Sequence, residues 1–235
     1  MKKIFWHFLL IFSLASFNDL SAQDIERFQN EVDIIVKRYA DYGISSISDS
    51  RITADQREKP LAVFTGSSSI RFWTSLSNDF PKFTVLNTGF GGSTYAELFH
   101  YRDLLIGQYA PDIIVIYEGD NDVTGTNSVD EIFATANDLY TYLTHELPET
   151  KIIILAAKPS PLRWNLKPLY DKLNSYVANF AHQNEQFIYV DIWKPMLGDN
   201  GKPMSSIFLS DSLHMNSEGY EIWKQTISPY LHEPK

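Results

Sequence analysis

Four short polar blocks carry the residue types that could do chemistry. They hold a run of serines, a glycine-rich turn, an asparagine between acidic residues, and a histidine three positions after an aspartate. Taken alone, each has an ordinary structural explanation, such as a helix N-cap, a turn that needs positive φ, or a polar loop. Together they supply four different parts of one reaction site. The blocks are Gly66-Ser67-Ser68-Ser69-Ile70-Arg71, Asn87-Thr88-Gly89-Phe90-Gly91-Gly92-Ser93, Glu118-Gly119-Asp120-Asn121-Asp122 and Asp211-Ser212-Leu213-His214.

Acyl transfer by serine is the chemistry that uses all four parts. It needs a hydroxyl, a base within hydrogen-bond reach, a group that orients the base, and donors aimed at the developing oxyanion. The serine cluster offers the hydroxyl, and His214 is the histidine that follows a predicted strand. Asp211 is three residues before His214, so one turn could aim its carboxylate at the imidazole. The oxyanion donors would be a backbone N–H of Gly91 or Gly92 and the side-chain amide of Asn121.

The elements that must position these blocks are strands alternating with helices. The strands are short, apolar and rich in β-branched or aromatic residues, as expected when both faces of a sheet are covered. We expect strands at 61–65, 83–86, 113–117, 151–155 and 187–190, and helices at 24–40, 95–109, 129–146, 166–184 and 216–230.

This alternation predicts an α/β fold: a three-layer α/β/α sandwich around a five-stranded parallel sheet, flavodoxin-like in outline. In such sheets, ligands bind beyond the carboxyl ends of the strands. Each polar block follows a predicted strand, so the blocks are expected to meet at one edge of the sheet.

The N-terminal part is expected to lie outside this fold. Lys2 and Lys3 precede an apolar run, and Ser21-Ala22 then offers a cleavage point. This order is typical of a secretory signal peptide, and the run is shorter than a membrane span requires. We therefore predict a signal peptide at 1–22, an N-terminal helix and connector at 23–59, and the catalytic domain at 60–235. The protein would be secreted or periplasmic, without a stable membrane anchor.

Composition excludes several classes of function. The 235 residues include no cysteine, which removes disulfides, thiolate metal sites and cysteine nucleophiles. With 29 acidic and 20 basic side chains, the net charge is −9, and this argues against nucleic acid as a partner. The oligomeric state is not readable from the sequence.

The four blocks, in this order, resemble those of the SGNH/GDSL hydrolases, a family of serine esterases and lipases. The similarity runs from about Leu61 to about Tyr230. Gly-Asp-Asn-Asp matches the family's Gly-x-Asn-Asp, and Asp-x-x-His matches its last block. The resemblance implies an SGNH hydrolase fold and the roles of five residues: Ser68 as nucleophile, His214 as base, Asp211 as the acid that orients it, and Gly92 and Asn121, with the Ser68 N–H, as oxyanion donors.

The chain departs from the family pattern at one position, where Ser67 replaces the aspartate of Gly-Asp-Ser. The spacing from Gly66 still assigns the nucleophile to Ser68. The resemblance then implies a carboxylic ester hydrolase that works through an acyl-enzyme, with no metal and no cofactor.

Other functions remain open at this stage. Asp120, Asp122, Asp211 and His214 could instead bind a metal for phosphoester hydrolysis. The domain could also be a catalytically inactive carbohydrate-binding module. A flavodoxin-like ligand binder is disfavoured, because the loops lack a phosphate cradle.

The substrate class is the least defined property. Glu118, Arg71 and Trp73 lie in or beside the blocks and are candidate substrate-binding residues, as are the aromatic and charged residues of 158–164. Aromatic and charged side chains suit sugar recognition, although they also occur as ordinary packing. We expect a small-molecule or carbohydrate ester with a short-chain acyl or acetyl group.

Overall fold

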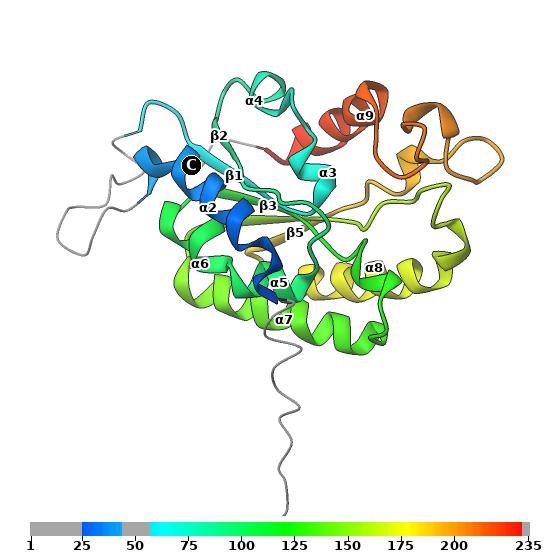
Figure 1. Cartoon of the computed structure of the whole chain (residues 1–235), viewed down its shortest axis with the longest axis horizontal. Coiled ribbons are helices and arrows are strands. Elements are labelled where there is room, and N and C mark those ends of the chain that lie inside the picture. Colours follow the sequence, from blue (N-terminus) through cyan, green and yellow to red (C-terminus); the bar gives the residue numbers. More distant parts are fainter. Residues whose placement is uncertain (1–24, 44–56, 232–235) are drawn as a thin grey trace, which may run out of the picture.

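The computed structural model of the chain describes residues 25–43 and 57–231 (Figure 1). The expected signal peptide, 1–22, and residues 44–56 of the expected connector lie outside the described residues. Within these ranges, no helix has the length and apolar character needed to cross a bilayer. The domain boundaries predicted from the sequence stay a prediction.

A five-stranded parallel sheet forms the centre of the molecule, as the sequence predicted. The strand order is β2-β1-β3-β4-β5. The chain places β2 on one side of β1 and then returns to place β3 on the other side, so the switch point lies between β1 and β3. Open sheets bind ligands at such a switch point, beyond the carboxyl ends of the strands. The strands are β1 Leu61–Gly66, β2 Thr84–Asn87, β3 Ile113–Tyr117, β4 Lys151–Leu155 and β5 Phe187–Val190.

Helices cover both faces of the sheet, which gives the three layers (Figure 1). One face packs against α2, α5, α6, α7 and α8, and the other against α3, α4 and α9. The α-helices are α2 Gln29–Arg38, α3 Ser68–Arg71, α4 Leu76–Asp79, α5 Tyr95–His100, α6 Arg102–Leu105, α7 Val129–Glu146, α8 Lys167–His182 and α9 Ser217–Ile227.

Short 3-10 turns join or extend these elements. They are η1 Glu26–Phe28, η2 Ala40–Tyr42, η4 Gly107–Tyr109, η5 Asp122–Thr124, η6 Trp164–Leu166, η7 Lys194–Met196, η8 Ser205–Ile207 and η9 Ser228–Tyr230.

Alternation along the strands divides the core in two. In β3, Ile114 and Ile116 face the α7 side, whereas Ile113, Val115 and Tyr117 face the α9 side. Successive side chains of a strand point to opposite faces, and both faces are buried here. This explains why the strand sequences are continuous apolar runs.

The segment expected as one helix over 95–109 is instead three short pieces: α5, α6 and η4. A capping box formed by Thr94 and Glu97 stabilises the N-terminus of α5. Gly107, a poor helix former, begins the last piece. Nothing in the sequence accounts for the break at Tyr101.

Candidate active site

The serine block leaves β1 through a tight turn at Gly66. This residue has a φ of +124°, and a Cβ atom there would lie 1.9 Å from the carbonyl oxygen of Tyr117 on β3. Only glycine fits such a close backbone approach. Ser67 then takes the N-cap position of α3, and Ser68 is the first residue of that helix. The turn therefore places Ser68 at the carboxyl end of the sheet.

Burial separates the three consecutive serines. Ser67 and Ser69 are 1% and 2% exposed, whereas the side chain of Ser68 is partly exposed. The Ser68 hydroxyl also lies 3.0 Å from Nε2 of His214, although 146 positions separate the two residues. Ser68 is thus the serine of this block that contacts the histidine.

His214, the partner of Ser68, is held in turn by Asp211, which lies three residues before it. Asp211 Oδ2 lies 2.6 Å from His214 Nδ1, and its Oδ1 accepts the backbone N–H groups of Leu213 and His214. Ser212, at a φ of +58°, completes the turn. The hydrogen bond from His214 and those from the backbone lower the pKa of Asp211 to about 2, because they favour the charged carboxylate. An ionised carboxylate therefore holds the imidazole at Nδ1, while Nε2 faces Ser68.

The carboxamide of Asn121, just after β3, is held at both ends. Its Nδ2 donates to the carbonyl oxygen of Ser93 at 2.8 Å, and its Oδ1 accepts from Arg163 Nη2 at 3.1 Å. An amide nitrogen carries two N–H bonds, so the Ser93 contact leaves one for another acceptor. Gly92, beside Ser93, has a φ of +77°. The structure thus brings the second and third blocks together.

The second block is also tied to the nucleophile's helix. Asn87 Nδ2 donates to the carbonyl oxygen of Ile70 in α3 at 2.7 Å, and Asn87 Oδ1 accepts the Gly89 N–H at 3.1 Å. One side chain therefore fixes the glycine-rich loop against the segment that carries Ser68.

A buried ion-pair cluster lies directly behind Asn121. Asp120 Oδ2 accepts from Lys158 Nζ at 3.0 Å and from the Tyr117 hydroxyl at 2.9 Å, and its Oδ1 accepts from Arg163 Nη1 at 2.7 Å and from the Tyr170 hydroxyl. Burial acts to raise the pKa of Asp120, but Lys158 and Arg163 outweigh it and hold that pKa below its ordinary value. Arg163 links this cluster to Asn121.

Glu118, a predicted substrate-binding residue, is buried instead. It is 1% exposed, its Oε1 accepts from the Ser93 hydroxyl, and its Oε2 has no hydrogen-bond partner. Burial, with Asp122 nearby, raises the pKa of Glu118 well above its ordinary value. Burial likewise raises the pKa of Asp122 to about 7. Glu118 therefore supports the glycine-rich loop through its contact with Ser93, and it is too buried to contact a substrate.

Trp73 and Arg71, the other two predicted substrate-binding residues, have different surroundings. Trp73 is 1% exposed and packs against Phe64 and Trp223, so its indole belongs to the core. Arg71 is exposed, and its Nε pairs with Glu31 of α2 at 2.9 Å. Only Arg71 of the three predicted residues lies where a substrate could reach it.

Three residues with exposed apolar side chains belong to segments that contact the turn of His214. The Phe72 ring meets the imidazole edge to face, with centroids 5.0 Å apart. The backbone of Leu162 donates to Ser212, and that of Leu209 donates to His214. All three side chains are exposed, at 45% for Phe72, 57% for Leu162 and 50% for Leu209. Of the three, Phe72 is the one whose side chain contacts the imidazole, so it gives His214 an exposed apolar neighbour.

Two carboxylates of the alternative metal site, those of Asp120 and Asp211, are engaged in other contacts. Both oxygens of Asp120 are occupied by cationic and hydroxyl donors, and both oxygens of Asp211 accept from its own turn and from His214. Over residues 25–43 and 57–231, no group of three or more His, Asp or Glu side chains is arranged to hold a metal ion. The arrangement instead suits a hydroxyl nucleophile with an adjacent base.

The profile of the GDSL-like lipase/acylhydrolase family matches residues 49–222, well over half of the sequence. The chain belongs to this family. As a family member it is an ester hydrolase, and its five-stranded parallel sheet is the SGNH hydrolase fold, as the resemblance implied.

Solved structures with the same fold come from several bacteria. A protein from Streptococcus pneumonia, provisionally described as a platelet activating factor, superposes with a TM-score of 0.72 at 19% identity, covering 92% of this chain and 100% of that one. A GDSL-like lipase from Bacteroides thetaiotaomicron gives 0.64 at 22%, covering 83% and 96%. The acetylxylan esterase Axe2 from Geobacillus stearothermophilus, as a catalytic mutant, gives 0.61 at 16%, covering 72% and 93%. No curated protein sequence matches the chain.

Some residues around the site were not singled out by the sequence. Leu162 and Leu209 lie beside recognised blocks, but Leu209 follows two other apolar residues and Leu162 stands near Trp164, so neither gave a usable signal. Glu31, which contacts the glycine-rich loop, gave none, because it sits among the ordinary charged residues of an amphipathic helix.

Proposed function

We propose that this family member is a serine esterase that cleaves small carboxylic esters through an acyl-enzyme. Ser68 is the nucleophile, His214 the general base and Asp211 the group that orients it. The observation that carries the proposal is the unbroken chain of contacts from Ser68 Oγ through the imidazole to Asp211, at 3.0 Å and 2.6 Å. Nucleophile, base and orienting acid in hydrogen-bond reach are the signature of an activated serine.

The proposed reaction has two halves. His214 Nε2 takes the proton from Ser68 as Oγ bonds to the ester carbonyl carbon. The backbone N–H groups of Ser68 and Gly92 and the remaining N–H of Asn121 stabilise the oxyanion. Collapse expels the alcohol, which receives the proton from His214. Water then attacks the acyl-enzyme with His214 again as base, releasing the acid and restoring Ser68. The steps use no metal and no cofactor.

The proposed substrate is an ester with a short acyl chain. The exposed Phe72 ring against the imidazole supports an apolar acyl group of a few carbons beside His214. The structural likeness to an acetylxylan esterase supports including acetylated sugars among the candidates. The signal peptide expected at 1–22 would place these esters outside the cytoplasm.

One panel tests both the reaction and the substrate class. Wild type, Ser68→Ala and Ser67→Ala are compared on acyl esters of increasing chain length and on acetylated sugars, with and without a chelator. We expect wild type and Ser67→Ala to hydrolyse short-chain esters and to react covalently with a fluorophosphonate. Ser68→Ala should do neither, and the chelator should change nothing.

Two outcomes would overturn this proposal. Turnover by Ser68→Ala near the wild-type rate would remove the serine from the mechanism, and loss of activity with the chelator would favour the metal-dependent phosphoesterase. Binding of sugars by a wild type without turnover of any ester would identify an inactive carbohydrate-binding module.

A further inference from the structure

The proposed oxyanion donor Gly92 lies in a stretch of backbone that needs outside support. The loop is fixed at its ends by Phe90 and Ser93, which are completely buried. Between them stand two consecutive, partly exposed glycines, Gly91 and Gly92. Glycine has the widest backbone freedom of any residue, so two in a row leave the peptide group between them free to rotate. That peptide group carries the Gly92 N–H.

Side chains from the N-terminal segment hold both neighbours of this peptide group. Glu31 of α2 accepts the Gly91 N–H through Oε1 at 3.2 Å, and Arg27 of η1 donates through Nη2 to the Gly92 carbonyl oxygen at 3.4 Å. The two contacts fix the peptide groups immediately before and after the one that carries the Gly92 N–H. Rotation of the middle group is thereby limited.

The same carboxylate reaches the helix of the nucleophile. Glu31 Oε1 also lies 2.9 Å from Nε of Arg71, the last residue of α3, whose first residue is Ser68. One carboxylate oxygen thus links the glycine loop to the nucleophile's helix. A charge-assisted contact of this kind is stronger and more directional than a neutral hydrogen bond.

The N-terminal segment is itself anchored firmly enough to act as a support. Val32 and Ile35 of α2 are buried against the core, and Phe28 packs edge to face on Phe90 with centroids 5.1 Å apart. Arg27 Nε pairs with Glu97 of α5 at 2.6 Å. The family profile begins at residue 49, so this support lies outside the segment that the profile matches.

We infer that Glu31, assisted by Arg27, is a positioning residue that orients the Gly92 N–H toward the oxyanion. This inference rests on the proposed function, because it gives Gly92 the role of donor. Glu31 touches no reacting atom. Its effect should therefore appear in the transition state, where the oxyanion exists, and not in substrate binding.

The test compares substitutions of Glu31 by steady-state kinetics on a short-chain ester. Glu31→Ala removes the acceptor, and we expect kcat to fall about 10- to 100-fold with KM within about 2-fold, since a small misplacement of a catalytic group can cost about 10². Glu31→Gln keeps an oxygen for the Gly91 N–H and should recover most of kcat. Glu31→Leu, which keeps the bulk of the side chain, repeats the loss if Glu31→Ala does not fold.

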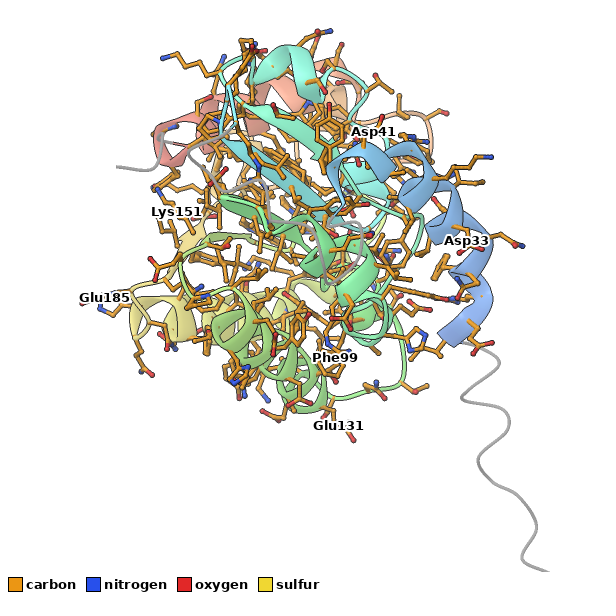
Figure 2. All side chains as sticks on the ribbon, turned by 90° about the vertical axis from the view of Figure 1, so that its left-hand side faces the viewer. Asp33, Asp41, Phe99, Glu131, Lys151 and Glu185 are labelled. Atoms are coloured by element: carbon orange, nitrogen blue, oxygen red, sulfur yellow. The ribbon has the colours of Figure 1, made fainter. Side chains whose placement is uncertain are left out.

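A matched control comes from the same helix. Asp33 lies on α2 at the edge of the molecule (Figure 2) and is exposed, and its carboxylate accepts a hydrogen bond from Gln29. Asp33→Ala should leave both kcat and KM unchanged. Thermal melts of all variants separate a loss of fold from a loss of turnover.

The outcomes distinguish failure of this inference from failure of the proposed esterase function. If Glu31→Ala and Glu31→Leu turn over like wild type while Ser68→Ala is inactive, the positioning role is wrong and the serine mechanism stands. If KM rises and kcat stays constant, Glu31 acts in substrate binding and the inference is overturned as well. Activity of Ser68→Ala would instead refute the proposed function itself.

Discussion

The carboxylate of Asp211 depends on donors that lie within its own turn. Both backbone N–H groups that it accepts, and the imidazole, come from the three residues that follow it. Such a local unit needs little help from the rest of the fold. This is why the short pattern Asp-x-x-His could be interpreted from the sequence.

A direct prediction concerns the ionisation of this group. We expect the carboxyl carbon of Asp211, followed by NMR, to titrate with a midpoint near 2, because the His214 hydrogen bond and the backbone donors favour the charged form. In His214→Ala the midpoint should rise toward 3.8. The stabilisation that this group gives the fold is present above about pH 4 and is lost as the pH falls through 2. A wild-type midpoint near 4 would contradict the contacts described for this turn.

Residue types and spacing predicted which blocks meet, but not which side chains are accessible. Three serines in a row look equivalent in sequence, and only the fold buries Ser67 and Ser69 while leaving Ser68 beside His214. Trp73 and Glu118 were expected to face substrate for their chemistry alone. Both point inward, and their direction depends on how the segments after β1 and β3 turn, which local sequence does not encode.

At the scale of elements, the loops after β3 and β4 are joined by buried charges. Asp120 follows β3, while Lys158 and Arg163 follow β4, and Lys158 is 0% exposed. A buried cation is tolerated only with a partner, so the pair fixes the distance between the two loops. Because Arg163 also donates to Asn121, the geometry of the proposed oxyanion site depends on these ion pairs.

Asp120→Asn should therefore be strongly destabilising. The amide leaves Lys158 and Arg163 without an anion inside the protein, and breaking a buried pair costs about 3–5 kcal/mol. For a chain of this size the melting temperature should fall by on the order of 10 °C in differential scanning calorimetry. The control is Asp130→Asn, which breaks an exposed pair with Lys172 and should not change the melt. An unchanged melt for Asp120→Asn would mean that the cluster does not hold the loops.

Elements of ordinary length were predictable, and very short ones were not. Helix α7 begins and ends where its apolar periodicity indicated, and strands β3, β4 and β5 begin and end with their apolar runs. Helices α3 and α4 have four residues each, which is about one turn and too short to display a period. Their positions follow from the turn at Gly66 and from packing against the sheet.

Over the whole molecule, acids with a raised pKa contribute to how stability responds to pH. The pKa of Glu118 is raised well above its ordinary value and that of Asp122 is raised to about 7, in both cases chiefly by burial. The folded protein then holds protons that the unfolded chain releases near pH 4. The free energy of unfolding should accordingly fall as the pH rises from about 4 to 7. Carboxylates with a lowered pKa, such as Asp120 and Asp211, have their effect below pH 4, where the stability that they contribute is lost as the pH falls.

Glu118→Gln tests this dependence. Glutamine keeps an oxygen for the Ser93 hydroxyl but cannot ionise, so the decline in melting temperature between pH 4.5 and 7 should become shallower than in wild type. Glu185→Gln changes an exposed side chain (Figure 2) and should preserve the wild-type slope. A wild type whose melting temperature is constant or rises across this interval would refute the role of Glu118 and Asp122.

Buried residues on both sides of the family match have a consequence for defining a minimal version of this enzyme. The family profile spans 49–222 and stops inside α9, whereas Val32 and Ile35 before it, and Trp223 and Ile227 after it, are buried in the core. A fragment cut at residues 49 and 222 would expose apolar surface at both cuts and lose the Glu31 contact. The profile gives the segment that is recognisable by sequence, whereas the buried residues give the segment that must be kept for the protein to fold. Truncations and library designs for this protein should follow the second boundary.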